Sequence, residues 1–126
     1  MAAFEIFNHD EKTTPTYQVT LLDEAGAPIP DADLLTLRLT FYDQDTAGII
    51  NTRTDQDALN ANDVAVSNGV VTWSMQVDDT PIVTAGKEHE IHVAEWEWTY
   101  QAGATPPTLT ARHKARFRTR NFLKEA

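Results

Sequence analysis

The chain has 126 residues, no cysteine and a formal net charge of −9 at pH 7. The missing cysteine excludes disulfides, thiolate nucleophiles and Cys-ligated zinc, and we expect folding in a reducing cytoplasm. The length predicts one domain, the sequence shows neither a membrane span nor a signal peptide, and the acidic balance argues against nucleic acid or anionic membrane as partners.

Strand patterns dominate the first half of the chain. Residues 17–22 alternate and run into a turn at 23–28, where Gly26 supplies a positive φ. The clearest half-buried strand is 35–41, because apolar and polar residues alternate there without a break. This alternation predicts that one face of the strand points into the core: Leu35, Leu37, Leu39 and Phe41. A short strand is expected at 48–50.

A β-hairpin is predicted in the middle of the chain. The polar residues 52–63 are expected to form a loop, and Asn68-Gly69 is a strong hairpin turn signal between 64–66 and 70–77. The pattern of the second strand places four side chains on one face: Val71, Trp73, Met75 and Val77. Asp78 and Asp79 precede Thr80-Pro81, and we interpret them as turn residues that close the strand, with no catalytic role.

The two longest predicted strands, 88–100 and 109–122, form a closing hairpin through the loop 101–107. With the preceding elements they predict an all-β, antiparallel β-sandwich of seven or eight strands, immunoglobulin-like in kind. We divide the chain into an N-terminal arm at 1–14, a single sandwich domain at 15–122 and a tail at 123–126.

The last predicted strand carries a row of cations in an otherwise acidic chain. Residues 1–110 contain eighteen Asp/Glu and four Lys/Arg, whereas residues 111–126 contain one Glu and six Lys/Arg. Five of these cations recur at every second position and therefore share one face of a strand: Arg112, Lys114, Arg116, Arg118 and Arg120. We call them the basic row.

The facing strand offers carboxylates that match the basic row. Its apolar residues change from odd to even positions, and a one-residue bulge near Ala94 would bring both sets to one face. With that bulge, four carboxylates oppose four cations, and His92 lies beside Arg116. The predicted charge ladder pairs Glu97 with Arg112, Glu95 with Lys114, Glu90 with Arg118, and Glu88 with Arg120.

Three interpretations of the basic row follow. The ladder reading makes it a solvent-facing device that sets the register of the hairpin, at about 0.2 to 1 kcal/mol per pair. The other two make it a surface for an external anion, or an electrostatic contact between subunits. We favour the ladder. If the carboxylates point elsewhere, the basic row is free to bind a partner.

Other candidate sites carry less weight. His89 and His92 are three apart, so on a regular strand they point to opposite faces, and we expect no metal site there or with His113. The three tryptophans, Trp73, Trp96 and Trp98, could form a platform for stacking sugars, but their alternation with polar residues favours the core. The sequence therefore predicts no catalytic, cofactor-binding or metal-binding residue, and no enzyme.

Several segments together resemble small β-sandwich virion proteins of tailed bacteriophages. These are Tyr17 to Ile29, Leu35 to Phe41, Asn62 to Trp73, Asp78 to Val83, and the closing pair Glu88 to Tyr100 and Arg112 to Phe122. The resemblance extends over about residues 16–122, and it lies in pattern and strand order. It implies a structural domain of the head, neck, tail or baseplate, without active-site residues.

From this resemblance we expect a non-enzymatic component of the virion, made in the host cytoplasm. It would be head-associated, in capsid decoration or head-to-tail joining, and would dock in many symmetric copies against other virion proteins, with no cofactor. The candidate apolar contacts are Phe4, Ile6, Phe7, Phe122 and Leu123. The alternative is a carbohydrate- or host-surface-binding module of a tail or baseplate, which would need an exposed tryptophan in a groove.

Overall fold

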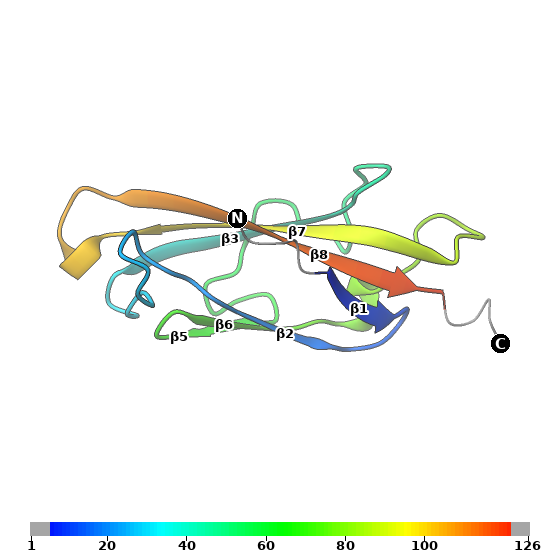
Figure 1. Cartoon of the computed structure of the whole chain (residues 1–126), viewed down its shortest axis with the longest axis horizontal. Coiled ribbons are helices and arrows are strands. Elements are labelled where there is room, and N and C mark those ends of the chain that lie inside the picture. The colour runs from blue at the N-terminus through cyan, green and yellow to red at the C-terminus, as the bar shows by residue number, and fades with distance from the viewer. Residues whose placement is uncertain (1–5, 122–126) are drawn as a thin grey trace.

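The protein is a sandwich of two β-sheets, seen in a computed structural model that describes residues 6–121 (Figure 1). The larger sheet has five strands in the order β1-β8-β7-β3-β4, and the smaller has three in the order β2-β6-β5. The bounds of the strands are β1 Ile6–Asp10, β2 Thr16–Thr20, β3 Leu34–Asp43, β4 Gln56–Asp57, β5 Val64–Ser67, β6 Val70–Ser74, β7 His89–Tyr100 and β8 Leu109–Arg120. Two short 3-10 helices, η1 Val77–Asp79 and η2 Ala102–Ala104, complete the described elements.

The all-β sandwich and its long closing hairpin are confirmed. One pairing is not antiparallel: β1 runs parallel to β8, from Ile6 opposite Arg116 to Asp10 opposite Arg120. We expected this segment to belong to an N-terminal arm, but it forms the edge strand of the larger sheet. The described residues include no helix long and apolar enough to cross a membrane.

Aromatic side chains fill the space between the sheets. Trp73 from β6 meets Trp96 from β7 edge to face, with ring centroids 5.7 Å apart, and Phe41 from β3 meets Trp73 in the same manner at 5.1 Å. Phe117 from β8 packs against both sheets through Phe41 and Trp73. Large rings of this kind supply much of the apolar area that a small sandwich can bury.

Strand β3 departs from the predicted pattern at its beginning. The pairing of β3 with β7 shifts by one residue between Leu34 and Thr36. As a result Leu34 is buried and Leu35 is 42% exposed, whereas Leu37, Leu39 and Phe41 face the core as predicted. A bulge inserts one extra residue and so reverses the faces on one side of it.

The β5–β6 turn forms at Asn68-Gly69 as predicted, and its glycine is required for two reasons. Both residues have positive φ, 46° for Asn68 and 86° for Gly69, as a tight hairpin turn demands. A Cβ on Gly69 would also lie 2.9 Å from the backbone nitrogen of Ile29. Beyond this hairpin Val77 leaves the strand pattern, because it begins η1 and is 50% exposed.

Candidate functional site

The basic row lies on the solvent face of β8, and its first two members pair with β7. Arg112 is opposite Glu97 and Lys114 is opposite Glu95. The Arg112 Nε atom donates to Glu97 Oε2 at 2.7 Å, while Lys114 Nζ is 3.7 Å from Glu95 Oε2. The half of the ladder next to the 101–107 loop is therefore observed.

Glu95 has a second partner in Tyr42 on β3. The tyrosine hydroxyl donates to Glu95 Oε2 at 2.5 Å. Burial and the hydrogen bond to Glu95 together raise the pKa of Tyr42 to about 12. The phenol thus remains a donor at neutral pH, and it fixes the carboxylate between β3 and β8.

The predicted bulge near Ala94 is wrong. The β7–β8 register continues without a shift, with Ala94 opposite Ala115 and Ile91 opposite Arg118. Glu90 therefore points to the inner face, where it is 2% exposed, and it does not pair with Arg118. The apolar residues of β7 change from odd to even positions for another reason. Glu90 and His92 occupy even-numbered, inner-facing positions that we expected to be apolar.

The second half of the basic row has other neighbours than predicted. Arg120 lies opposite His89, and its Nε donates to Asp10 of β1 at 2.8 Å, so the predicted pair with Glu88 is not formed. Arg116 Nε donates to Gln44 Oε1 at 3.3 Å. Among residues 6–121, no carboxylate lies within ion-pair distance of Arg118.

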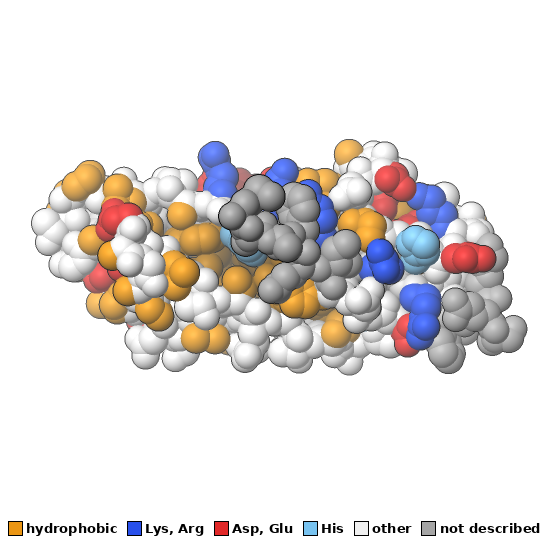
Figure 2. Space-filling model, in the orientation of Figure 1, with side chains coloured by type: hydrophobic (Ala, Val, Ile, Leu, Met, Phe, Trp, Pro, Cys, Tyr) orange, Lys and Arg blue, Asp and Glu red, His pale blue; other side chains and the backbone are white. Residues whose placement is uncertain are grey.

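A surface recess of about 470 Å³ lies at this end of the basic row. Its walls come from β1, from the end of β8 and from the start of β7, and they include Asn8, Asp10, Glu88, His89, Arg118 and Arg120. Figure 2 shows Lys and Arg side chains, with a histidine among them, grouped mainly over the right half of this view, where β8 ends.

The predicted apolar contacts of the arm are only partly described. Phe7 of β1 packs edge to face on Tyr17, with ring centroids 4.9 Å apart, and it also contacts Phe117 at 5.6 Å. It is thus part of the sandwich, and it is not an external anchor. Ile6 begins β1. Phe4, Phe122 and Leu123 lie outside the described residues.

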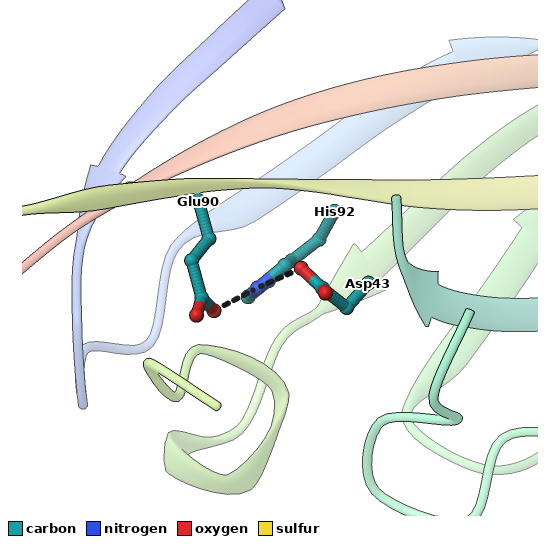
Figure 3. A group of neighbouring side chains, drawn as sticks. All are labelled: Asp43, Glu90 and His92. Atoms are coloured by element: carbon teal, nitrogen blue, oxygen red, sulfur yellow. Dashed lines mark hydrogen bonds and ion pairs between the residues drawn. The ribbon is translucent and has the colours of Figure 1, made fainter. Parts of the chain in front are cut away.

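A buried polar cluster joins the inner face of β7 to the end of β3. Figure 3 shows Glu90 and His92 on β7 and Asp43 on β3, with their side chains converging. His92 Nε2 is 2.9 Å from Glu90 Oε1 and 3.8 Å from Asp43 Oδ1. All three residues are at most 2% exposed, and their ligand atoms lie within 4.8 Å of one another. We call this the Asp-Glu-His cluster.

Each carboxylate of the cluster is held from outside by the backbone of a loop. The amides of Val83 and Thr84 donate to the two oxygens of Glu90 at 2.8 and 2.7 Å. Thr46 donates its amide and its hydroxyl to Asp43 Oδ2 at 3.0 and 2.8 Å. The remaining oxygen, Asp43 Oδ1, is buried and has no hydrogen-bond partner.

A relay connects the cluster to β1. Thr119 Oγ1 on β8 is 3.3 Å from His92 Nδ1 and 2.7 Å from His9 Nε2. Burial, together with the charge of His92, lowers the pKa of His9 to about 4, although Asp10 opposes the shift. His9 is therefore neutral at pH 7, so its hydrogen bond with Thr119 joins two uncharged groups.

A second buried cluster has a cation of its own. Arg53, 2% exposed, donates Nε to Asp79 Oδ1 at 2.6 Å and Nη2 to Asp79 Oδ2 at 2.9 Å. Nη2 also donates to Asp63 Oδ2 at 3.0 Å, Nη1 donates to Gln56 Oε1 at 2.8 Å, and the guanidinium lies 5.4 Å from the Trp73 ring centroid. We call this the Arg-Asp cluster.

The Arg-Asp cluster explains the folded course of the polar loop 52–63. Burial alone would lower the pKa of Arg53, but the hydrogen bonds and charges of Asp79 and Asp63 outweigh it and raise the pKa. Asp79 also accepts bonds from the Asn51 side chain and the Gln76 amide, at 2.9 and 2.7 Å. These contacts hold the loop 52–63 and η1 in place against the sandwich.

The remaining predicted candidates are placed as follows. His89 and His113 are exposed on β7 and β8, and neither joins His92. The tryptophans are buried as expected: Trp73 is 0% exposed, Trp96 1% and Trp98 6%. No indole face is therefore open for stacking against a sugar, and the carbohydrate-binding alternative loses its proposed platform.

Sequence reasoning missed both buried clusters. Arg53 was expected in a polar loop, and Glu90 was expected on the outer face of its strand. One signal was available for the Asp-Glu-His cluster: Glu90, His92, Ala94, Trp96 and Trp98 share the parity of a core-facing strand. Following that parity without a bulge would have turned Glu90 and His92 inward together.

No family model, curated protein or solved structure matches the chain.

Proposed function

We propose that this chain is a non-enzymatic structural component of a tailed-phage virion. It would be head-associated, in capsid decoration or in head-to-tail joining, and would dock in multiple symmetric copies. The phage assignment rests on the resemblance of the strand patterns. The observation that supports docking is the incomplete neutralisation of the basic row, in which Arg118 borders a recess and has no carboxylate partner within residues 6–121.

The recess has the chemistry to receive carboxylates. Arg118 and Arg120 line it together with His89 and the amide of Asn8, so donors outnumber the two acidic groups, Asp10 and Glu88. A guanidinium on a rigid strand loses little freedom when it binds a carboxylate through two hydrogen bonds. Glu90 would have neutralised this part of the row, but it is turned into the core.

The opposite end of the sandwich is acidic and partly apolar, and so its charge is complementary to that of the basic recess. The loops 22–33 and 101–108 lie together there (Figure 1), and they contain four acidic residues and no Lys or Arg. Leu22, Leu35 and Val70 are between 39% and 44% exposed near the same end. An acidic and apolar end that meets a basic recess of the next copy is a heterologous contact, which closes into a ring when the rotation permits.

Incorporation into particles tests this proposal. Phage lacking the gene would be complemented with wild-type protein, with Arg118→Glu, or with Arg112→Glu as a charge-matched control at the far end of the row. Quantitative mass spectrometry of purified particles should find the wild-type chain in multiple copies, and at least tenfold fewer copies of Arg118→Glu.

The control should be incorporated at near wild-type level, because Arg112 lies outside the recess. Absence of the wild-type chain from purified particles would contradict the virion assignment itself. Normal incorporation of Arg118→Glu would instead contradict the docking surface and leave the virion assignment in place. Circular dichroism of both purified variants would verify that each is folded.

A further inference from the structure

The Asp-Glu-His cluster places two carboxyl groups in the core with a single imidazole. Two carboxylates are buried side by side, and burial of an ionised carboxylate is costly unless a cation or several donors compensate it. Among residues 6–121, His92 is the only basic side chain within ion-pair distance of Asp43 or Glu90. One imidazolium would still leave a net charge of −1 in the core.

The hydrogen bonds around the cluster point to the same gap. Both oxygens of Glu90 and one oxygen of Asp43 receive donors from the surrounding loops. Asp43 Oδ1 alone receives none, although it is buried and directed toward His92 Nε2 at 3.8 Å. An acceptor without a donor, next to an imidazole nitrogen and a second carboxylate, is the arrangement of a ligand set.

We propose that Asp43, Glu90 and His92 bind one divalent transition-metal ion, of which Zn²⁺ is the type. Bonds of about 2.0 to 2.2 Å with tetrahedral angles place two ligand atoms about 3.3 to 3.6 Å apart. The observed separations from His92 Nε2, 2.9 Å to Glu90 and 3.8 Å to Asp43, bracket this range. The imidazole ligand favours zinc, copper, iron or nickel over calcium, magnesium and manganese, which prefer oxygen ligands.

The second layer of the cluster supports this assignment. A ligating histidine usually binds a partner through its other ring nitrogen, and ligating carboxylates are themselves hydrogen-bonded. His92 Nδ1 has Thr119 Oγ1 at 3.3 Å, Glu90 has two backbone amides, and Asp43 has Thr46. His92 Nε2 and Asp43 Oδ1 face the centre of the cluster (Figure 3), where the ion would replace the 2.9 Å hydrogen bond between His92 Nε2 and Glu90 Oε1.

The ion would have a structural role. Its ligands come from the end of β3 and from β7, and Glu90 in turn holds the loop at Val83 and Thr84. The metal would therefore fasten the turn after β3 and this loop to the larger sheet. Three protein ligands leave a fourth position for water or for the second oxygen of a carboxylate. The proposed metal site does not depend on the virion assignment.

The first experiment uses the wild-type chain without an affinity tag. The protein is stripped with EDTA, dialysed, and titrated with ZnCl₂ by isothermal titration calorimetry. We expect one equivalent bound per chain, and a melting temperature several degrees higher in Zn²⁺ than in EDTA. Co²⁺ should give visible d–d bands whose intensity reports a four- or five-coordinate site.

Two variants and two controls locate the site. Asp43→Asn removes one carboxylate ligand while keeping an oxygen for Thr46, and Glu90→Gln does the same for the second ligand; each should weaken Zn²⁺ binding at least tenfold. His89→Ala and His113→Ala remove exposed histidines from the same hairpin and should bind as wild type. The proposal is overturned if the wild-type chain binds no stoichiometric Zn²⁺ or Co²⁺, or if the control variants lose binding and Asp43→Asn does not.

Discussion

The two buried polar clusters solve the same electrostatic problem in different ways. In the Arg-Asp cluster the chain supplies its own cation, because Arg53 binds Asp79 through two nitrogens and Asp63 through a third contact. In the Asp-Glu-His cluster two carboxylates converge on one imidazole, and Asp43 Oδ1 has no donor. The first cluster is complete within the chain, and the second is not.

Whether a buried charged group can bind a ligand depends on whether the chain itself satisfies all of its polar atoms. A buried ion pair in which every polar atom is hydrogen-bonded fixes loops to a sheet, and it has no free donor or acceptor with which to bind a ligand. A buried carboxylate oxygen without a donor, such as Asp43 Oδ1, is still available to bind a ligand. Residue types alone do not separate the two cases, since each cluster contains two acidic residues; the number of donors around them does.

The largest effect is expected at the complete cluster. Replacing Arg53 by Met leaves Asp79 buried without its cation, and we expect a loss of about 3 to 5 kcal/mol in the free energy of unfolding. Urea denaturation followed by tryptophan fluorescence would measure it. The double variant Arg53→Met/Asp79→Leu should recover part of the loss, because it removes the unpaired charge. A loss below about 1 kcal/mol in the single variant would show that the buried Asp79 does not depend on Arg53 for its stability.

An intermediate effect is expected where the incomplete cluster reaches β1 through Thr119 and His9. The pKa of His9 is about 4 in the folded protein, and 6.5 is the ordinary value. The unfolded chain therefore binds the proton first, and this contribution to stability is lost as the pH falls from about 6.5 to 4. The slope is at most about 1.4 kcal/mol per pH unit, and lower for this partly exposed ring.

His9→Gln keeps a polar partner for Thr119 and removes the titration. Between pH 7 and pH 5, the wild-type chain should lose more unfolding free energy than this variant does. His113→Gln, an exposed position on β8, serves as the control and should show a smaller change. A difference that is constant with pH would show that His9 is not held neutral by the fold.

The smallest effect is expected at the exposed pair of Arg112 and Glu97. Their side chains are 77% and 39% exposed, so Glu97→Gln should cost less than about 1 kcal/mol. The cost should fall further in 0.5 M NaCl, where the screening length is about 4 Å. Urea denaturation at low and high salt measures both values. A loss as large as that of Arg53→Met would mean that exposure does not separate the two kinds of ion pair.

The sequence alone determined the fold class and the first half of the charge ladder. Alternation identifies strands because the side-chain period of a strand is two, and Asn68-Gly69 marks a hairpin because few residue pairs accept two positive φ angles. Close to the 101–107 loop the chain itself fixes the register, so the pairs of Glu97 with Arg112 and Glu95 with Lys114 could be predicted.

Only the tertiary structure decided which charges are buried. Arg53 and Asp79 are 26 residues apart, and Asp43 lies 47 residues before Glu90, so neither meeting is visible in a local pattern. Polar residues in loops and turns normally face water, and they are buried only where distant segments supply matching donors or cations. The same limit explains the parallel edge strand β1, since its pairing with the last strand of the sheet joins the two ends of the described chain.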